Sequence, residues 1–142
     1  MVNELTFISA RDIDYEFIRS LRNAPELSRG FIVQVHITPE QQADYMAKYA
    51  NCYFVALKKN EPVGFIGVVG GDLRLAVARE HQRQGIASYM LRQIEAHCID
   101  YIVRVKPDNI ASLRMFMKNG FSIEGTAECR GVEILIMKKA GA

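Results

Sequence analysis

The spacing of hydrophobic positions in the first third of the chain predicts one strand followed by two helices. Residues 5–8 (Leu-Thr-Phe-Ile) form a short β-prone run, and the apolar residues within 12–21 recur at helical spacing. A second helix is expected to start at 38–41 (Thr-Pro-Glu-Gln) and to run to about residue 49, because a Thr cap, a Pro at the first helical position and a Gln three residues after the cap satisfy the free amides of a helix start. The connection between the helices, residues 25–35, has no regular pattern.

The middle of the chain predicts a three-strand meander. Residues 52–58 and 62–69 are apolar β-type runs, and the short polar segment Lys59-Asn60-Glu61 between them is typical of an antiparallel hairpin. Gly70-Gly71 then turns the chain into a third run at 73–78.

The last third predicts two helices and three strands. Apolar residues within 88–98 can share one helical face, and 101–105 is another β-type run. A further helix is expected to end at Asn119-Gly120, where Gly supplies the left-handed cap, and the runs 121–123 and 132–137 close the chain as strands. Together the elements predict an α/β (α+β) fold with a mixed, mostly antiparallel central sheet of about seven strands and helices on both faces.

Composition narrows the class of protein without identifying it. A length of 142 residues fits a single domain over residues 1–142. With 49% apolar and 24% charged residues the chain can bury a core, which excludes wholesale disorder. The charge balance of 18 − 16 = +2 is too even for a general nucleic-acid binder or a polybasic membrane sensor.

The reactive side chains and the N-terminal residues indicate a cytoplasmic protein without a metal. The cysteines and histidines lie far apart with no metal-ligand spacing, so we expect no disulfide framework and no metal site. The N-terminus has no basic and apolar signal regions, and no apolar run approaches the roughly 18 residues that a membrane span needs. The residues concerned are Cys52, Cys98, Cys129, His36, His81 and His97.

The segment with the clearest chemistry is 82–87 (Gln-Arg-Gln-Gly-Ile-Ala), which ends a predicted strand and opens directly into a helix. Backbone N–H groups at a helix start have no intrahelical acceptors and lie at the positive end of the dipole, so they can hold a phosphate or diphosphate. Gly85 lets a ligand approach the backbone closely, Ala87 keeps the helix entry small, and Arg83 can add a charge-assisted contact. The alternative is a strand-to-helix turn that merely needs a Gly.

A second motif follows at 109–121, an Asn-containing helix that ends in Gly-Phe. With these two motifs the chain resembles the GNAT family of acyl-CoA N-acyltransferases. The family's pyrophosphate signature, Gln/Arg-x-x-Gly-x-Gly/Ala, is met by Gln82, Gly85 and Ala87. The likeness is strongest over about residues 64–121, and the flanking order of elements agrees with a GNAT-like fold.

The resemblance implies acetyl-CoA, or another acyl-CoA, as the bound cofactor. It places the pantetheine arm and the thioester along Ala76, Val77 and Ala78, where this strand splays from the strand at 101–105, with the N–H near Ala76 donating to the thioester carbonyl. It also lets Asn109 reach the cofactor's arm from the far side, although a plain helix cap would explain the same residue. The residues implied to hold the diphosphate are Arg83, Gln84, Gly85, Ile86, Ala87 and Ser88.

Acyl transfer to an amine needs a proton acceptor, because an amine with a pKa near ~10 is almost wholly protonated at neutral pH. By the resemblance, Asp72 matches the position of the glutamate that serves as base in the histone-acetylating branch. Asp is one methylene shorter, and a turn Asp after Gly70-Gly71 needs no catalytic reason. Glu133 on the last strand is the rival, whereas Glu80 and His81 are expected to be solvated.

The resemblance also points to an acid for the leaving thiolate, a tyrosine seven residues after the helix Asn. That position is Phe116 here, and a phenyl ring cannot donate a proton. Tyr101 or Tyr89 could substitute, or the thiolate could leave unassisted, since a thiol pKa near ~8.5 makes it a tolerable leaving group.

The acceptor is predicted to be a small-molecule amine, in the first instance a nucleotide-linked amino sugar. The segments 21–25, 37–40 and 112–125 resemble the branch that contains ribosomal-protein N-terminal and amino-sugar N-acetyltransferases. Selection is expected within 23–36, with help from a loop at 126–131. Alternatives are a protein N-terminal acetyltransferase, a non-catalytic acyl-CoA-binding module, and a toxin that acylates charged tRNA.

Two further expectations concern charge and assembly. Arg22 or Arg29 would bind a phosphate or carboxylate of the acceptor, against the alternative that both are solvated charges. The sheet edge near the last two strands offers a pairing surface for a homodimer.

Overall fold

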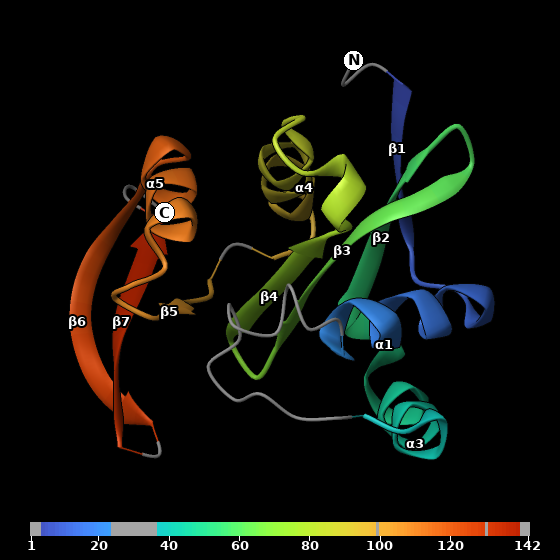
Figure 1. Cartoon of the computed structure of the whole chain (residues 1–142), viewed down its shortest axis with the longest axis horizontal. Helices are drawn as coiled ribbons and strands as arrows, with labels where there is room; N and C mark the ends of the chain where they lie inside the picture. The colour runs from blue at the N-terminus through green and yellow to red at the C-terminus, as the bar shows by residue number, and fades with distance from the viewer. Residues whose placement is uncertain (1–3, 24–36, 99, 130, 140–142) are drawn as a thin grey trace.

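The computed structural model describes residues 4–23, 37–98, 100–129 and 131–139 (Figure 1). Short 3₁₀ turns at Asp12–Asp14, Ala50–Cys52 and Arg79–His81 accompany the longer elements. In chain order these are β1 Leu5–Ser9, α1 Tyr15–Asn23, α3 Pro39–Tyr49, β2 Tyr53–Lys58, β3 Glu61–Val69, β4 Asp72–Val77, α4 Ile86–Ile94, β5 Val103–Val105, α5 Ile110–Lys118, β6 Phe121–Cys129 and β7 Val132–Lys139.

The strands form two antiparallel sheets, of order β1-β2-β3-β4 and β5-β7-β6. The sheets meet at one parallel bridge between Asp72 and Ile102. There the Leu73 N–H donates to the Ile102 carbonyl over 2.9 Å, and the Ile102 N–H donates to the Gly71 carbonyl over 2.8 Å. Beyond this bridge β4 and β5 diverge, so the combined sheet opens into a V (Figure 1). The expectation of a mixed, mostly antiparallel sheet of about seven strands is confirmed.

Helices cover both faces of the four-stranded sheet, as predicted. Side chains alternate along β4, so neighbouring residues point into different cores. Leu73 and Val77 pack in the core that includes α4 and α5. Ala76 packs in the second core, with α1 and α3. The V between β4 and β5 therefore has α4 and α5 on one side and α1 and α3 on the other.

Two local signals in the sequence are realised as predicted. The Thr38 hydroxyl accepts from the Gln41 N–H over 3.2 Å, while the Gln41 side chain accepts from the Thr38 N–H over 2.9 Å, which completes the cap of α3. The β2–β3 turn has φ of 51° at Lys59 and 67° at Asn60. Two left-handed residues in succession make the type of hairpin turn whose twist suits antiparallel strands.

Other boundaries differ from the prediction. The expected helix at 12–21 begins as a 3₁₀ turn and becomes α-helical only at Tyr15, and α4 begins and ends earlier than the expected helix at 88–98. The expected loop at 126–131 is wrong over 126–129, because β6 continues to Cys129. The polar side chains of β6 are mostly exposed on this outer strand, so no alternation of apolar residues marked it in the sequence.

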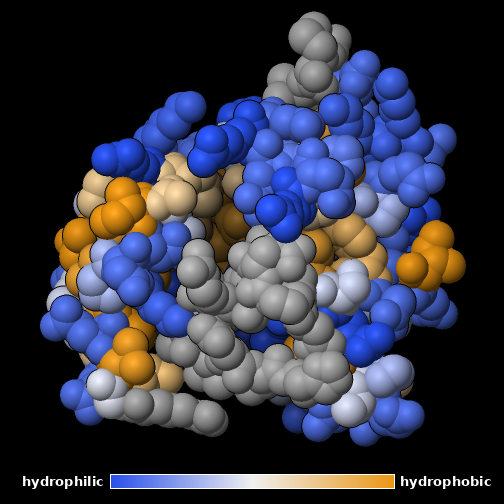
Figure 2. Space-filling model, viewed as in Figure 1, coloured by the Kyte–Doolittle hydropathy of each residue, from blue (hydrophilic) through white to orange (hydrophobic). Residues whose placement is uncertain are grey.

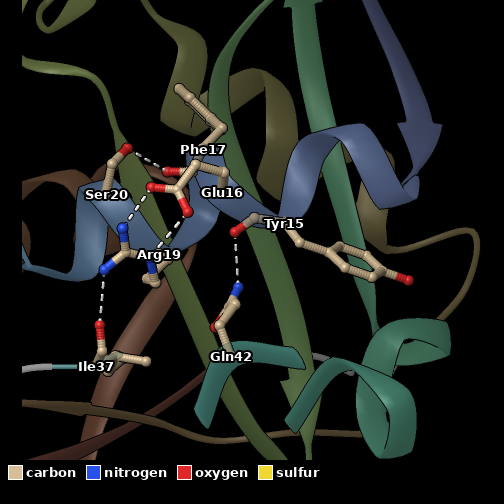
Figure 3. Close-up of polar contacts among 7 residues, drawn as sticks. All are labelled: Tyr15, Glu16, Phe17, Arg19, Ser20, Ile37 and Gln42. Carbon is tan, nitrogen blue, oxygen red and sulfur yellow. Dashed lines mark hydrogen bonds and ion pairs between the residues drawn. The ribbon is translucent and has the colours of Figure 1, made fainter. Parts of the chain in front are cut away.

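Polar contacts fix α3 against α1 (Figure 3). The Arg19 guanidinium donates to the Ile37 carbonyl over 2.9 Å and also pairs with Glu16. The buried Gln42 side chain donates to the Tyr15 carbonyl over 2.8 Å. These two long-range bonds hold the start of α3 in one position on the side of the V that carries the second core.

Close packing around Gly67 gives a stability prediction. A Cβ added at Gly67 would lie 2.6 Å from the buried Tyr53 ring and 2.9 Å from the Cys52 carbonyl. Because neither neighbour is a flexible side-chain end, Gly67→Ala should lower the free energy of unfolding by about 1–3 kcal/mol, measured by urea denaturation. The matched control is Gly125→Ala, whose Cβ would meet nothing within 4 Å. Equal stability of the two variants would contradict the packing argument.

No helix in the described part of the chain is both long enough and apolar enough to cross a membrane.

The predicted homodimer stays a prediction. Its proposed surface, β6, is the outer strand of its sheet, and the exposed apolar side chains of Ile123 and Val132 lie on this hairpin.

Candidate active site

The turn between β4 and α4 has the backbone geometry of an anion-binding site. Arg83 and Gly85 adopt left-handed conformations, with φ of 65° and 80°, and such turns make successive N–H groups converge. α4 begins at Ile86 with Gly85 as its N-cap, and no side chain caps its first amides. Within the described residues, the N–H groups of 83–85 donate to no backbone carbonyl. These amides are therefore available to a ligand at the positive end of the helix dipole.

Side chains around this turn add positive charge and fix its position. Lys58, at the end of β2, donates to the Gln84 side chain over 3.1 Å, and Arg83 is exposed in the turn itself. The Gln82 side chain donates to the Val77 carbonyl over 3.2 Å, which ties the turn to the end of β4. Free amides with two nearby cations fit the diphosphate of coenzyme A. Sequence reasoning missed Lys58, because only the fold brings the end of β2 beside the turn.

The direction of the backbone groups along β4 follows from its hydrogen bonds. The Ala78 N–H donates to the Val63 carbonyl at β3 over 2.8 Å, whereas the Leu73 N–H donates to Ile102 on the β5 side. In an antiparallel strand, the backbone N–H and C=O groups of every second residue bond to the same neighbouring strand. The β3–β4 register has no irregularity that would change this alternation. Ala76 therefore pairs with β3, as Ala78 does.

The expected thioester donor near Ala76 stays a prediction, but on this geometry it would be a neighbour of Ala76, because the Ala76 N–H is directed at β3. The N–H groups that point into the V are those of Leu75 and Val77, one residue to either side. The bond from Gln82 to the Val77 carbonyl agrees, because that carbonyl is free of β3. The open edge of β4 thus offers two amide donors between the diverging sheets.

Helix α5 meets the start of α4 through Asn119. Its side chain donates to the Ser88 hydroxyl over 3.0 Å and to the Met115 carbonyl over 2.8 Å. Asn109 caps α5, because its side-chain oxygen accepts from the Ser112 N–H over 3.3 Å. Asn109 therefore acts as a helix cap in this structure, and a contact between Asn109 and a cofactor stays a prediction. The sequence marked Asn119 only as the end of a helix. In the structure its side chain joins α5 to the start of α4.

Asp72 lies at the closed end of the V, where the two sheets meet. Its Oδ2 pairs with the Arg104 guanidinium at 3.2 Å. Its Oδ1 is buried and has no hydrogen-bond donor among the described residues. A buried carboxylate oxygen without a donor is costly, so this atom is suited to accept a proton or an N–H from a ligand. The side chain is 26% exposed, which leaves a path for such a ligand or for water.

The three positions considered for the acid differ in their surroundings. Phe116 is buried and packs edge-on against Phe121, with ring centroids 5.3 Å apart. The Tyr89 hydroxyl points away from the V and donates to the Leu5 carbonyl over 3.5 Å. The Tyr101 hydroxyl is buried without a partner in the described chain, and burial raises its pKa. Of Tyr89 and Tyr101, only Tyr101 has a hydroxyl proton that is not used in a hydrogen bond within the described chain.

The remaining candidates are dispersed. Glu133 is exposed and lies opposite Glu128 on the β6–β7 hairpin, and Glu80 is exposed beside the partly buried His81. Arg29 lies outside the described residues, as does nearly all of the segment 23–36 that was expected to select the acceptor. Within the described chain, no group of three His, Cys, Asp or Glu side chains is placed to hold a metal ion.

The space-filling view shows a recess where the two sheets diverge. Figure 2 shows a hollow with a hydrophobic floor between the side of the molecule that carries α5 and β7 and the side that carries α4 and β4. The amide-rich turn and the open edge of β4 border the same V. This arrangement can bind an anionic group at a helix start and a neutral, hydrogen-bonding chain along the strand edge.

Solved structures share this fold. The spermidine N-acetyltransferase from Vibrio cholerae, in complex with CoA and spermine, is 16% identical, with a TM-score of 0.82 over 95% of this chain and 94% of that one. A GNAT-family acetyltransferase from Streptococcus pneumoniae is 19% identical, with a TM-score of 0.73 over 94% and 98%. Arabidopsis thaliana Naa50, with the bisubstrate analogue CoA-Ac-MVNAL, is 17% identical, with a TM-score of 0.67 over 94% and 97%.

No curated protein matches the sequence. The model of the acetyltransferase (GNAT) family matches residues 16–121, a span that includes the β4–α4 turn and both strands that border the V. The predicted fold and the predicted class, acyl-CoA-dependent N-acetyltransferase with acetyl-CoA as donor, are thereby confirmed. The chain belongs to the GNAT acetyltransferase family.

Proposed function

We propose that this protein transfers an acetyl group from acetyl-CoA to the primary amine of a small molecule, such as a nucleotide-linked amino sugar. The observation that carries the proposal is the V between β4 and β5, which opens beside a turn with unpaired amides and a buried carboxylate oxygen at its closed end. Acetyl-CoA supplies the acetyl group as an activated thioester. Transfer forms one C–N bond and breaks one C–S bond. An ammonium acceptor loses two protons, of which one ends on the thiol of coenzyme A and one in the solvent.

The residues proposed to hold acetyl-CoA come from the end of β2, from β4, from the turn that opens into α4 and from the start of α5. The diphosphate would lie on the amides of 83–88, with Lys58 and Arg83 supplying charge. The amides of Leu75 and Val77 would donate along the strand edge, including to the carbonyl oxygen on which negative charge develops. Asn109 would approach the arm from α5. Ala76 and Ala78 would contribute the surface of β4 rather than amide donors.

Asp72 is the proposed proton acceptor. Because Arg104 occupies Oδ2, the carboxylate presents Oδ1 to the acceptor amine or to an intervening water. The ion pair with Arg104 also holds the carboxylate in one orientation at the closed end of the V. Glu133, which is exposed on the β6–β7 hairpin, is the alternative base.

The substitution Phe116→Tyr tests whether a tyrosine acid is missing. The added hydroxyl would extend from a buried ring that packs against Phe121, which also contacts the Tyr101 ring. We expect kcat to stay unchanged or to rise, by at most about tenfold, because thiolate departure is tolerable without an acid. Steady-state kinetics at several pH values provide the measurement. A fall in kcat with unchanged thermal stability would show that the phenyl ring itself has a function.

A thiol-release assay with a panel of amines tests the proposed function. The panel contains a UDP-linked amino sugar, spermidine and a peptide with a free N-terminus, each with acetyl-CoA. The proposal predicts release of free thiol with the amino sugar above the rate with the other two. Preferred turnover of the peptide would instead identify a protein N-terminal acetyltransferase. Protection against heat by acetyl-CoA without turnover of any amine would identify a binding module.

A further inference from the structure

Arg74 lies on β4 two residues after Asp72, on the face of the sheet that α1 and α3 cover. Asp72, Arg74 and Ala76 alternate with the residues of the α4 core, and Ala76 packs in the α1–α3 core. Arg74 is therefore a neighbour of the proposed base on the side of the V away from α4. The proposed function uses no group at this position.

The Arg74 guanidinium is held by tyrosine hydroxyls. Its Nη1 donates to the Tyr45 hydroxyl over 3.0 Å, and the hydroxyls of Tyr45 and Tyr53 lie 2.7 Å apart. Tyr53 is fully buried, and Tyr45 comes from α3. Burial raises the pKa of Tyr45, with a smaller rise from its bond to Tyr53, so this hydroxyl stays neutral. The tyrosines thus orient the guanidinium without neutralising its charge.

The charges around Arg74 do not balance. No carboxylate of the described chain lies within 4 Å of it, and the nearby Asp72 pairs with Arg104 at 3.2 Å. Arg22, from α1, is close enough to act on Tyr45. Within the described residues, Arg74 therefore has no carboxylate of its own, because Asp72 already pairs with Arg104. A partly buried guanidinium without a counter-charge is unfavourable unless a ligand supplies one.

We propose that Arg74, oriented by Tyr45 and Tyr53, binds a carboxylate or phosphate group of the acceptor while Asp72 receives the amine. The inference rests on the proposed function and specifies the class of acceptor, an amine that also carries an anion. A planar guanidinium fixed by a second bond is suited to bind either anion through two parallel N–H groups. The same excess of positive charge disfavours polyamines.

The test compares acceptors with and without an anionic group. The probes are a UDP-linked amino sugar, an amino acid with a free amine and carboxylate, and the same amino sugar without its UDP group. For Arg74→Met, KM for the preferred anionic acceptor should rise by about tenfold or more, because a charge-assisted contact is lost. KM for the amino sugar without UDP and the affinity for coenzyme A should stay unchanged. Arg74→Lys should recover part of the loss, and Tyr45→Phe should show a smaller loss of the same kind.

Arg92→Met is the control, because Arg92 is an exposed residue of α4. Calorimetric titration of each anionic probe into the protein saturated with coenzyme A gives a second readout without turnover. Binding that weakens in Arg74→Met but leads to no acetylation would support the anion site and overturn the proposed function. Three results would overturn the anion site alone: acetylation with an equal loss for acceptors with and without an anion, acetylation with no loss at all, or a preference of the wild type for spermidine.

Discussion

Replacing Asp72 with Asn should lower kcat by roughly 10²- to 10⁴-fold, the range that a positioned general base contributes. Asn has the same shape as Asp and can still accept a hydrogen bond from Arg104, which donates to the native side chain at 3.2 Å. It carries no charge and cannot take a proton from an ammonium. The loss should therefore fall on kcat, with the affinity for coenzyme A unchanged.

The pH–rate profile distinguishes this role from a structural one. For the wild type, kcat/KM should fall as the pH is lowered through the range in which the carboxylate becomes protonated, and Asp72→Asn should remove that limb. Glu133→Gln is the matched control, because it removes a carboxylate from an exposed position on the hairpin. An unchanged profile in Asp72→Asn, or the larger loss in Glu133→Gln, would eliminate Asp72 as the base.

Replacing Gly85 with Ala should weaken coenzyme A binding by about 30- to 100-fold, the equivalent of one or two charge-assisted hydrogen bonds. Gly85 has φ of 80°, which a Cβ makes unfavourable, and it stands at the start of α4 where the diphosphate amides converge. Relaxation of the strained backbone would turn those amides away from the ligand. Isothermal titration calorimetry with coenzyme A provides the measurement.

Gly131→Ala is the control for backbone strain. Gly131 has a nearly identical φ of 81° and open space for a Cβ, but it lies in the β6–β7 turn. Both variants should lose similar stability, and only Gly85→Ala should lose affinity for coenzyme A. Equal affinities in the two variants would mean that the β4–α4 turn does not hold the diphosphate.

Local signals predicted the parts of the fold that depend on nearby residues. The cap of α3 was readable because Thr38, Pro39 and Gln41 satisfy one another's backbone within a single turn. The amide-rich turn was readable because a Gly at a helix start has few structural substitutes. The extension of β6 was not, since an outer strand with polar side chains on both faces shows no hydrophobic period.

Features that depend on strand register or on distant contacts could not be predicted. The choice between Ala76 and its neighbours as amide donors depends on the ladder with β3, which the sequence of β4 does not contain. The bond from Arg74 to Tyr45 joins residues 29 positions apart, and that from Lys58 to Gln84 joins residues 26 apart. Sequence reasoning proposed Arg22 or Arg29 for recognition of the acceptor because both lie in or beside the connection at 23–36, and it overlooked Arg74 inside a strand.

Backbone amide shifts of the ¹⁵N-labelled protein, recorded during titration with acetyl-CoA, test the central claim most directly. At 16.1 kDa the chain is suited to such spectra. The largest changes should occur at residues 83–88, with a second group at Leu75 and Val77, and the hairpin turn at Gly131 should not respond. Saturable shifts centred on another part of the chain, or no shifts at all, would contradict a cofactor site in the V between β4 and β5.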